Sequence, residues 1–366
     1  MKSMDFTFTE EQETVAKVAR QLFEYRATPE RLTDLEAADV RYDVALWHEL
    51  ASADLLGIAL PENIGGSGHG FLELALLLTE VGWSVAPVPV YATLLLGADT
   101  IARHGSEAQR QRYLPEVING NLLLTMGLTE PGRSDPSTPS TTASRDGGRW
   151  RISGVKELVP AGQLVNTVLV PAATDEGDVR VFLVSTDDSG VEVRPVGTTN
   201  HEPHADVYLD GAVVSDDEHL VAEVDDLYAR AVVGLCATQL GVTERALHIA
   251  AAYTTEREQF GRPIGSFQAV QQRMADAFID VEAIRWTMWQ AAWLLGQDRQ
   301  AAREASIAKF WAAEAGARVA ATAQQVHGGI GIDTTYPLFR YFLWAKHNEL
   351  TLGSASAHLA RLGAAY

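Results

Sequence analysis

Two long helical patterns are interrupted by Arg257-Glu258-Gln259-Phe260-Gly261-Arg262-Pro263-Ile264-Gly265-Ser266-Phe267-Gln268, a compact polar and aromatic turn. A guanidinium can hold phosphate oxygens through two parallel hydrogen bonds, and Phe260 beside it offers an aromatic face to a ring system. Gly261 and Gly265 let the chain bend, and Pro263 suits the first turn of the following helix. The stretch is therefore a candidate anchor for an anionic cofactor, the alternative being a helix connection with a merely solvated arginine.

The composition bounds the class of protein. A chain of 366 residues is long enough for two or three packed units, and 46% hydrophobic with 21% charged residues exclude a disordered chain. The net charge of -19 argues against a nucleic-acid surface, because such binding depends on neutralising phosphates. A local basic pocket can still hold a phosphorylated small molecule. We expect no metal site.

The sequence gives no sign of a membrane or secreted protein. Its N-terminus, Met1-Lys2-Ser3-Met4-Asp5, lacks the basic and then apolar order of a signal peptide. No apolar run approaches the ~20 residues that span a bilayer. The single cysteine, Cys236, reads as a small buried hydrophobe in a reducing compartment. We expect a cytoplasmic protein.

The hydrophobic period changes twice along the chain. It is helical up to about residue 120, where the run 72–78 predicts an unusually buried helix. From about 121 the period is two, most clearly at Val179, Val181 and Leu183, which predicts a small antiparallel barrel or sandwich. The Ser, Thr and Pro residues of 137–144 predict a surface loop. The helical period returns after about 216.

The last third predicts a helical bundle. Met274, Val281, Met288 and Leu295 recur every seven residues, as in a core-facing stripe of a long helix. The aromatic residues around this stripe are expected in the core or at a subunit interface rather than at a cofactor: Trp286, Trp289 and Trp293.

Several short motifs, in their order and spacing, resemble the acyl-CoA dehydrogenase family over nearly the whole chain. They are Phe8-Thr9-Glu10-Glu11-Gln12, Leu60-Pro61-Glu62 with Gly65-Gly66, Tyr113-Leu114-Pro115, Leu128-Thr129-Glu130-Pro131-Gly132, the stretch 257–268, and Gln325-x-x-Gly328-Gly329-x-Gly331. The resemblance implies an α+β multidomain fold, with an N-terminal helical domain (1–120), a middle antiparallel β domain (121–215) and a C-terminal four-helix bundle (216–366).

The resemblance also implies a chemistry. Enzymes of this family hold FAD between the β domain of one subunit and the C-terminal helices of another, and they oxidise the Cα–Cβ bond of an acyl-CoA thioester. A glutamate takes the α-proton while flavin N5 takes the β-hydride. The expected electron acceptor is an electron-transfer flavoprotein.

The half-site that grips the ADP part of a neighbour's FAD matches the family at six positions. Arg257 is expected to meet the pyrophosphate and Phe260 to pack on the cofactor. The other four are expected to supply polar contacts or to bring the backbone close to the cofactor: Gln268, Gln325, Gly328 and Gly329.

The half-site for the flavin ring departs from the family. Its expected cofactor contacts are Leu128, Thr129 and Ser134, in a loop one residue shorter than the family pattern. Leu158 replaces the family's ring-covering tryptophan, and Pro160 replaces a threonine whose hydroxyl contacts N5. Proline has neither that hydroxyl nor a backbone N–H, so two hydrogen bonds to the ring are lost.

The family's catalytic glutamate is missing. Its position falls on Leu352, and the alternative position of some members falls on Ala231, so neither side chain can accept a proton. A positioned base contributes typically ~10²–10⁴ in rate. Tyr228 and Glu349 lie about one helical turn from these positions and are candidate substitutes, but no catalytic residue is assigned.

The segment Leu352-Gly353-Ser354-Ala355-Ser356-Ala357-His358 resembles a branch found in bacteria that degrade sterol side chains. Some members of that branch are α2β2 heterotetramers in which one chain supplies the base and flavin bed and the other only the ADP grip. The leading hypothesis is this second kind of chain, acting on a bulky acyl-CoA. The alternatives are a homotetramer with another base or other flavin chemistry, and a structural partner without flavin.

Overall fold

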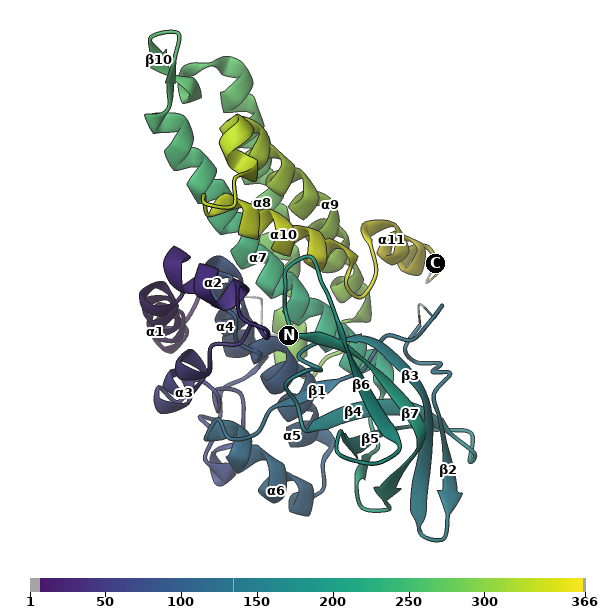
Figure 1. Cartoon of the computed structure of the whole chain (residues 1–366). Coiled ribbons are helices and arrows are strands. Elements are labelled where there is room, and N and C mark those ends of the chain that lie inside the picture. The colour runs from purple at the N-terminus through teal and green to yellow at the C-terminus, as the bar shows by residue number, and fades with distance from the viewer. Residues whose placement is uncertain (1–6, 134, 365–366) are drawn as a thin grey trace.

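The computed structural model describes residues 7–133 and 135–364, and Figure 1 shows the sheet of the middle part beside the N-terminal helices, with the long C-terminal helices extending away from both. The N-terminal helices are α1 (Glu10–Arg26), α2 (Pro29–Glu36), α3 (Val44–Ser52), α4 (Phe71–Ser84), α5 (Thr100–His104) and α6 (Glu107–Ile118), with a π-helical segment η2 (Tyr91–Asp99) before α5 and a short 3₁₀ turn η1 (Glu62–Ile64). The motif Phe8-Thr9-Glu10-Glu11-Gln12 forms the start of α1. There the Thr9 hydroxyl accepts from the Gln12 N–H at 3.2 Å and the Gln12 side chain accepts from the Thr9 N–H at 3.0 Å, a capping box.

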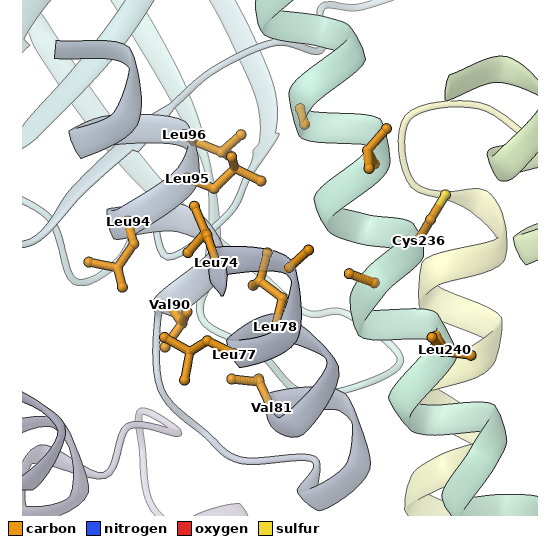
Figure 2. Close-up of a cluster of buried hydrophobic side chains, with 14 of the residues drawn as sticks. Leu74, Leu77, Leu78, Val81, Val90, Leu94, Leu95, Leu96, Cys236 and Leu240 are labelled. Atoms are coloured by element: carbon orange, nitrogen blue, oxygen red, sulfur yellow. The ribbon is translucent and has the colours of Figure 1, made fainter. Parts of the chain in front are cut away.

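Helix α4 is buried almost all round, as its apolar run predicts. It packs against the long helix α7 (Val224–Glu256), and Figure 2 shows Leu74, Leu77, Leu78 and Val81 facing the η2 leucines and α7. The two backbones approach closely at a pair of glycines. A Cβ on Gly82 would lie 2.0 Å from the Thr238 carbonyl oxygen, and one on Gly241 would lie 1.9 Å from that of Thr79. Only glycine therefore fits at these crossings.

The middle of the chain is an eight-stranded sheet. Its strands are β1 (Leu124–Met126), β2 (Thr142–Asp146), β3 (Arg149–Val159), β4 (Thr167–Thr174), β5 (Val179–Ser185), β6 (Val191–Val196), β7 (His204–Ser215) and β8 (His219–Leu220), in the spatial order β6-β7-β3-β2-β4-β5-β8 with β1 also paired to β4. The sheet is mixed, because β1 and β2 both run parallel to β4. The antiparallel prediction was therefore wrong at these two pairings. The loop predicted over 137–144 is also shorter, since its last three residues belong to β2.

The C-terminal part is a bundle of long helices. After α7 come the two-residue strands β9 (Glu258–Gln259) and β10 (Arg262–Pro263), a 3₁₀ turn η3 (Ile264–Ser266), α8 (Gln268–Gly296), α9 (Ala302–His327), a 3₁₀ turn η4 (Gly328–Ile332), α10 (Leu338–Leu350) and α11 (Ala355–Ala364). Helices α8, α9 and α10 all pack against α7.

The stripe on α8 confirms the bundle pattern in part. Val281, Met288 and Leu295 are buried, whereas Met274 is only partly covered. Of the three tryptophans, Trp289 is buried, Trp293 is half-buried and Trp286 remains 44% exposed. The free thiol of Cys236 is buried in α7 as expected. None of the helices in the described residues is long and apolar enough to cross a bilayer.

Candidate functional site

Residues 258–263 form a β-hairpin at the tip of α7 and α8 (Figure 1). Its two-residue loop is Phe260-Gly261, with φ of 55° and 76°, and positive φ at both positions is the geometry of a type I′ turn. Pro263 therefore lies in β10 and not in the first turn of α8, which corrects the prediction for that residue. The turn holds Phe260 in a left-handed conformation and leaves it 93% exposed.

Arg257 lies at the C-terminal end of α7, where its backbone closes the hairpin. Its N–H donates to the Tyr253 carbonyl at 2.9 Å, and its carbonyl accepts from the Ile264 N–H at 2.8 Å. The exposed guanidinium has no hydrogen-bond or ion-pair partner within residues 7–133 and 135–364. A rigid backbone thus presents an unpaired cation beside an exposed aromatic ring, which suits an anionic group attached to a ring.

The glycine turn after α9 joins this tip through a stack of rings. Tyr253, one turn before Arg257, stacks on His327 with centroids 4.2 Å apart. Nδ1 of His327 lies 2.7 Å from the Ala323 carbonyl and therefore donates, so Nε2 accepts from the Tyr336 hydroxyl at 3.1 Å. Sequence reasoning missed both tyrosines, and the only available signal was the spacing of Tyr253 from Arg257.

The other predicted residues of this half-site lie on the surface around the tip. Gln268 begins α8, and Gln325 lies near the end of α9 beside a groove of about 810 Å³ between the two helices. Gly328 has φ of 64°, and a Cβ on Gly328 or Gly329 would meet no described atom within 4 Å. The backbone there is open to another molecule. We call Arg257, Phe260, Gln268, Gln325, Gly328 and Gly329 the clamp.

The clamp lies at the opposite end of α7 and α8 from the strands (Figure 1). Helix α7 has 33 residues, which at 1.5 Å per residue is about 50 Å. One chain therefore offers the clamp at one end of the molecule and the β domain at the other.

A second site lies between the β domain and the C-terminal helices, as a cavity of about 570 Å³. Leu128, Thr129, Leu158 and Pro160 line its β-domain wall. The facing helical wall is formed by Tyr91, Leu96, Tyr228, His347, Leu350, Thr351, Leu352, Gly353, Ala357, Ala360, Arg361 and Ala364. The predicted contact Ser134 lies outside the described residues.

The backbone groups around Leu158 and Pro160 are already bonded within the chain. The Leu158 N–H donates to an Asp206 carboxylate oxygen at 2.9 Å, and the Pro160 carbonyl accepts from the Thr125 hydroxyl at 2.6 Å. Pro160 has no N–H to offer. Of the predicted contacts, Leu128 is buried, and the Thr129 carbonyl accepts from the Glu157 N–H at 2.9 Å.

The acidic residue of the Thr-Glu-Pro-Gly motif is fully engaged. Glu130 accepts from buried Lys156 at 2.6 Å and from the backbone N–H groups of Ser140 and Thr141 at 2.5 and 3.1 Å. Burial by itself raises the pKa of Glu130, but the Lys156 charge and these hydrogen bonds outweigh it and lower the pKa to about 2. Glu130 is therefore a structural carboxylate that cannot act as a base near neutral pH.

Both positions of the family's glutamate hold apolar residues whose carbonyls are capped by tyrosines. The Leu352 carbonyl accepts from the Tyr228 hydroxyl at 2.6 Å and from His358 Nε2 at 2.9 Å. The Ala231 carbonyl accepts from the Tyr91 hydroxyl at 3.0 Å. Burial raises the pKa of Tyr228 to about 12, so its hydroxyl remains a donor.

The other candidate substitute, Glu349, does not reach the cavity. Its carboxylate pairs with Lys346, and it is not among the residues that line the second site. The cavity's acidic lining residues, Glu130, Asp135 and Glu157, all come from the β domain. Within the described residues, the helical wall contributes no carboxylate.

Three family models match consecutive parts of the chain: the acyl-CoA dehydrogenase N-terminal domain over residues 9–121, the middle domain over 125–212 and the C-terminal domain over 229–366. The chain belongs to the acyl-CoA dehydrogenase family. It is thus an oxidoreductase that acts on acyl-CoA, with FAD as its cofactor.

Relatives of this acyl-CoA dehydrogenase chain match it end to end. Acyl-CoA dehydrogenase FadE27 of Mycobacterium tuberculosis is 40% identical, covering 98% of each chain. The ChsE4-ChsE5 complex of the same organism superposes with a TM-score of 0.94 at 39% identity, covering 99% of this chain and 98% of the other. A variant of the steroid ACAD Tcur3481-Tcur3483 superposes with a TM-score of 0.92 at 44% identity, covering 97% of each.

The two half-sites of this acyl-CoA dehydrogenase fit FAD unequally. The clamp fits, because Arg257 is unpaired, Phe260 is exposed and the glycine turn is open to an approaching group. The half-site for the flavin ring does not fit, because the Leu158 N–H already donates to Asp206 and Pro160 has no N–H.

Proposed function

We propose that this chain is the subunit without a catalytic base in a heterotetrameric α2β2 acyl-CoA dehydrogenase. It lends its clamp to FAD whose ring is held by a related partner chain, and that partner supplies the glutamate. The observation that carries the proposal is the cavity lining: the helical wall opposite Leu158 and Pro160, where the family's base belongs, has no carboxylate among the described residues.

In this proposal the residues of this chain bind and orient; they do not transfer protons. Arg257 would hold the pyrophosphate with charge-assisted hydrogen bonds, and Phe260 would pack on the cofactor. Gln325 would add a polar contact, and the open glycine turn would let its backbone approach the cofactor closely. When bound, the flavin accepts a hydride from the substrate's β-carbon.

The substrate we propose is a bulky acyl-CoA with a steroid-like side chain, used in steroid degradation. The proposal is supported by the likeness to a chain of a steroid ACAD and by the Leu352–His358 ending. We further propose domains at 1–120, 121–215 and 216–366, a cytoplasmic location and an electron-transfer flavoprotein as acceptor.

The test is to purify the chain alone and after co-expression with a related chain that carries the glutamate. Flavin absorbance and dye-linked dehydrogenase activity are measured on both samples. We expect the chain alone to be colourless and inactive, and the co-expressed assembly to be yellow and active. A yellow, active homo-oligomer of this chain alone would refute the proposal.

The clamp is tested in the co-expressed assembly. Arg257→Ala should lower the flavin content at least about tenfold, because a bidentate, charge-assisted contact is lost. Arg194→Ala is the matched control, since Arg194 is an exposed arginine of the β domain that pairs with Glu192. Equal flavin content in the two variants would show that Arg257 does not hold the cofactor.

A further inference from the structure

Three potential metal ligands meet where the β domain touches the C-terminal bundle. Glu202 precedes β7, His204 is the first residue of β7, and His347 lies in α10. One ligand atom from each lies within 4.8 Å of the others, and the two imidazole centroids are 5.0 Å apart at 68°. His204 is 2% exposed, and the other two side chains are half-buried. Neither the clamp nor the base positions include any of them.

The hydrogen bonds leave one potential ligand atom free on His204 and on Glu202. Nδ1 of His204 lies 3.3 Å from the Glu202 carbonyl and must donate to it, so the lone pair of this neutral ring is on Nε2. A second hydrogen bond that fixes the tautomer in this way is the usual support of a metal-binding histidine. The side chain of Asn200 donates to one Glu202 oxygen at 2.6 Å and leaves the other available.

His347 is a polar group without a partner. Neither ring nitrogen makes a hydrogen bond to any residue in the part of the chain that the structure describes. The ring nitrogens are not among the fully buried polar atoms, and His347 lines the second cavity, so a lone pair on the ring is open to a ligand that enters from there. Its closest polar neighbours in the cluster are the ligand atoms of Glu202 and His204.

We propose that Glu202, His204 and His347 form a binding site for a divalent transition metal of the zinc type. Two imidazoles and one carboxylate are a common ligand set for Zn²⁺, whereas Mg²⁺ and Ca²⁺ prefer oxygen ligands. His204 and His347 also line the second cavity, from which water can supply a fourth ligand. This site departs from the sequence-based expectation of no metal, because 143 positions separate the two histidines and no local motif marks them.

The site needs a small contraction to bind metal. Tetrahedral bonds of ~2.0–2.1 Å place ligand atoms roughly 3.4 Å apart, so a separation at the 4.8 Å limit has to close by about 1.4 Å. The half-buried side chains of Glu202 and His347 have room to turn, while His204 is held by its hydrogen bond. Arg41 lines the adjoining cavity and donates to the Asn200 carbonyl at 2.7 Å, and its charge opposes that of the metal.

A bound metal would connect the start of β7 to α10 across the domain contact. Helix α10 leads directly into the loop that carries Leu352, so the metal would fix the helical wall of the second cavity against its β wall. This role does not depend on which chain supplies the catalytic glutamate.

The experiment uses full-length chain whose purification tag has been removed, and the co-expressed assembly if the chain needs its partner. After treatment with a chelator and dialysis, Zn²⁺ is titrated calorimetrically, bound metal is counted by elemental analysis, and Co²⁺ is added as a spectroscopic probe. We expect one equivalent of metal per chain and the visible absorption of tetrahedral Co²⁺.

Two variants and one control separate this site from adventitious binding. His347→Ala and Glu202→Gln should each weaken binding at least about tenfold and abolish the Co²⁺ spectrum. Glu202→Gln retains the acceptor for Asn200, so a folding defect is not expected. His69→Ala removes a histidine outside the cluster and should bind metal as the unaltered chain does. Absence of metal binding, or equal binding by all variants, would overturn the proposal.

Discussion

The Tyr228 hydroxyl donates a 2.6 Å hydrogen bond to the Leu352 carbonyl, at the position of the family's catalytic glutamate. The same arrangement occurs at the alternative position, where Tyr91 donates to the Ala231 carbonyl at 3.0 Å. Tyrosine hydroxyls thus face both base positions as donors, and neither offers an acceptor for a substrate proton. The difference from the family extends beyond the missing carboxylate, because the hydrogen bonds around both positions are formed without it.

Restoring the carboxylate should therefore not restore activity. Leu352→Glu adds a base to the helical wall, but Pro160 and the bonded N–H of Leu158 still leave the ring unsupported. We expect no dehydrogenase turnover from this variant alone, as measured with dye reduction. Leu359→Glu is the control, because Leu359 is an exposed residue of the neighbouring helix α11 that does not line the second cavity. Turnover by Leu352→Glu above this control would mean that the missing glutamate is the only defect.

We expect Phe260 to contribute to cofactor binding and not to the stability of the fold. A left-handed conformation costs a non-glycine residue about 1–2 kcal/mol, so Phe260→Gly should not lower the free energy of unfolding. The same change should reduce flavin retention in the assembly, since the exposed ring is removed. Gly261→Ala is the opposite case: it keeps the ring and strains the turn. Chemical denaturation and flavin content measure the two effects, and flavin retention by Phe260→Gly would exclude a cofactor role for the ring.

The Glu130–Lys156 pair should be the most sensitive ion pair of the β domain. Lys156 is 1% exposed, so Glu130→Gln leaves an unpaired buried charge and should cost about 3–5 kcal/mol of unfolding free energy. Adding Lys156→Met to this variant should recover most of the loss. Glu192→Gln breaks an exposed pair and should change little. A small effect of Glu130→Gln, equal to that control, would contradict the buried pairing.

His358 should make the fold sensitive to acid. Burial lowers its pKa from 6.5 to about 4, although its hydrogen bond to the Leu352 carbonyl opposes the shift. The unfolded chain therefore binds more protons between these values, so stability is full above pH 6.5 and falls as the pH decreases toward 4. The loss is on the order of 3 kcal/mol, at ~1.4 kcal/mol per pH unit.

The comparison uses His358→Gln, which keeps a donor for Leu352 but does not titrate. Urea denaturation at several pH values should show a shallower decline for the variant than for the unaltered chain. Parallel curves over this window would indicate that His358 has the same pKa in both states.

Long amphipathic patterns and buried apolar runs made the helical domains predictable. The run 72–78 falls in a helix that is buried almost all round, and three of the four stripe positions on α8 are in the core. Strand direction was not predictable, because alternation looks the same in a parallel and an antiparallel strand. The β9–β10 hairpin was also hidden, since two-residue strands have no period and Phe260 is an unusual residue for a left-handed turn.

The candidate site could be proposed from the sequence where the family resemblance assigns a position. Arg257 and the glycine turn were assigned in this way, and so were the base positions that hold Leu352 and Ala231. Contacts between distant segments were not predictable: Tyr253 meets His327 across 74 positions, and nothing local predicts that Tyr228 caps Leu352.

The position of the clamp at the far tip of a helix about 50 Å long has a consequence for cofactor retention. In the proposed heterotetramer, a dinucleotide bound there would be shared between two polypeptides, so its occupancy would follow mass action between protomers as well as the supply of flavin. Dilution should release the cofactor as the assembly dissociates, and a cell that makes the two polypeptides in unequal amounts would leave the surplus colourless.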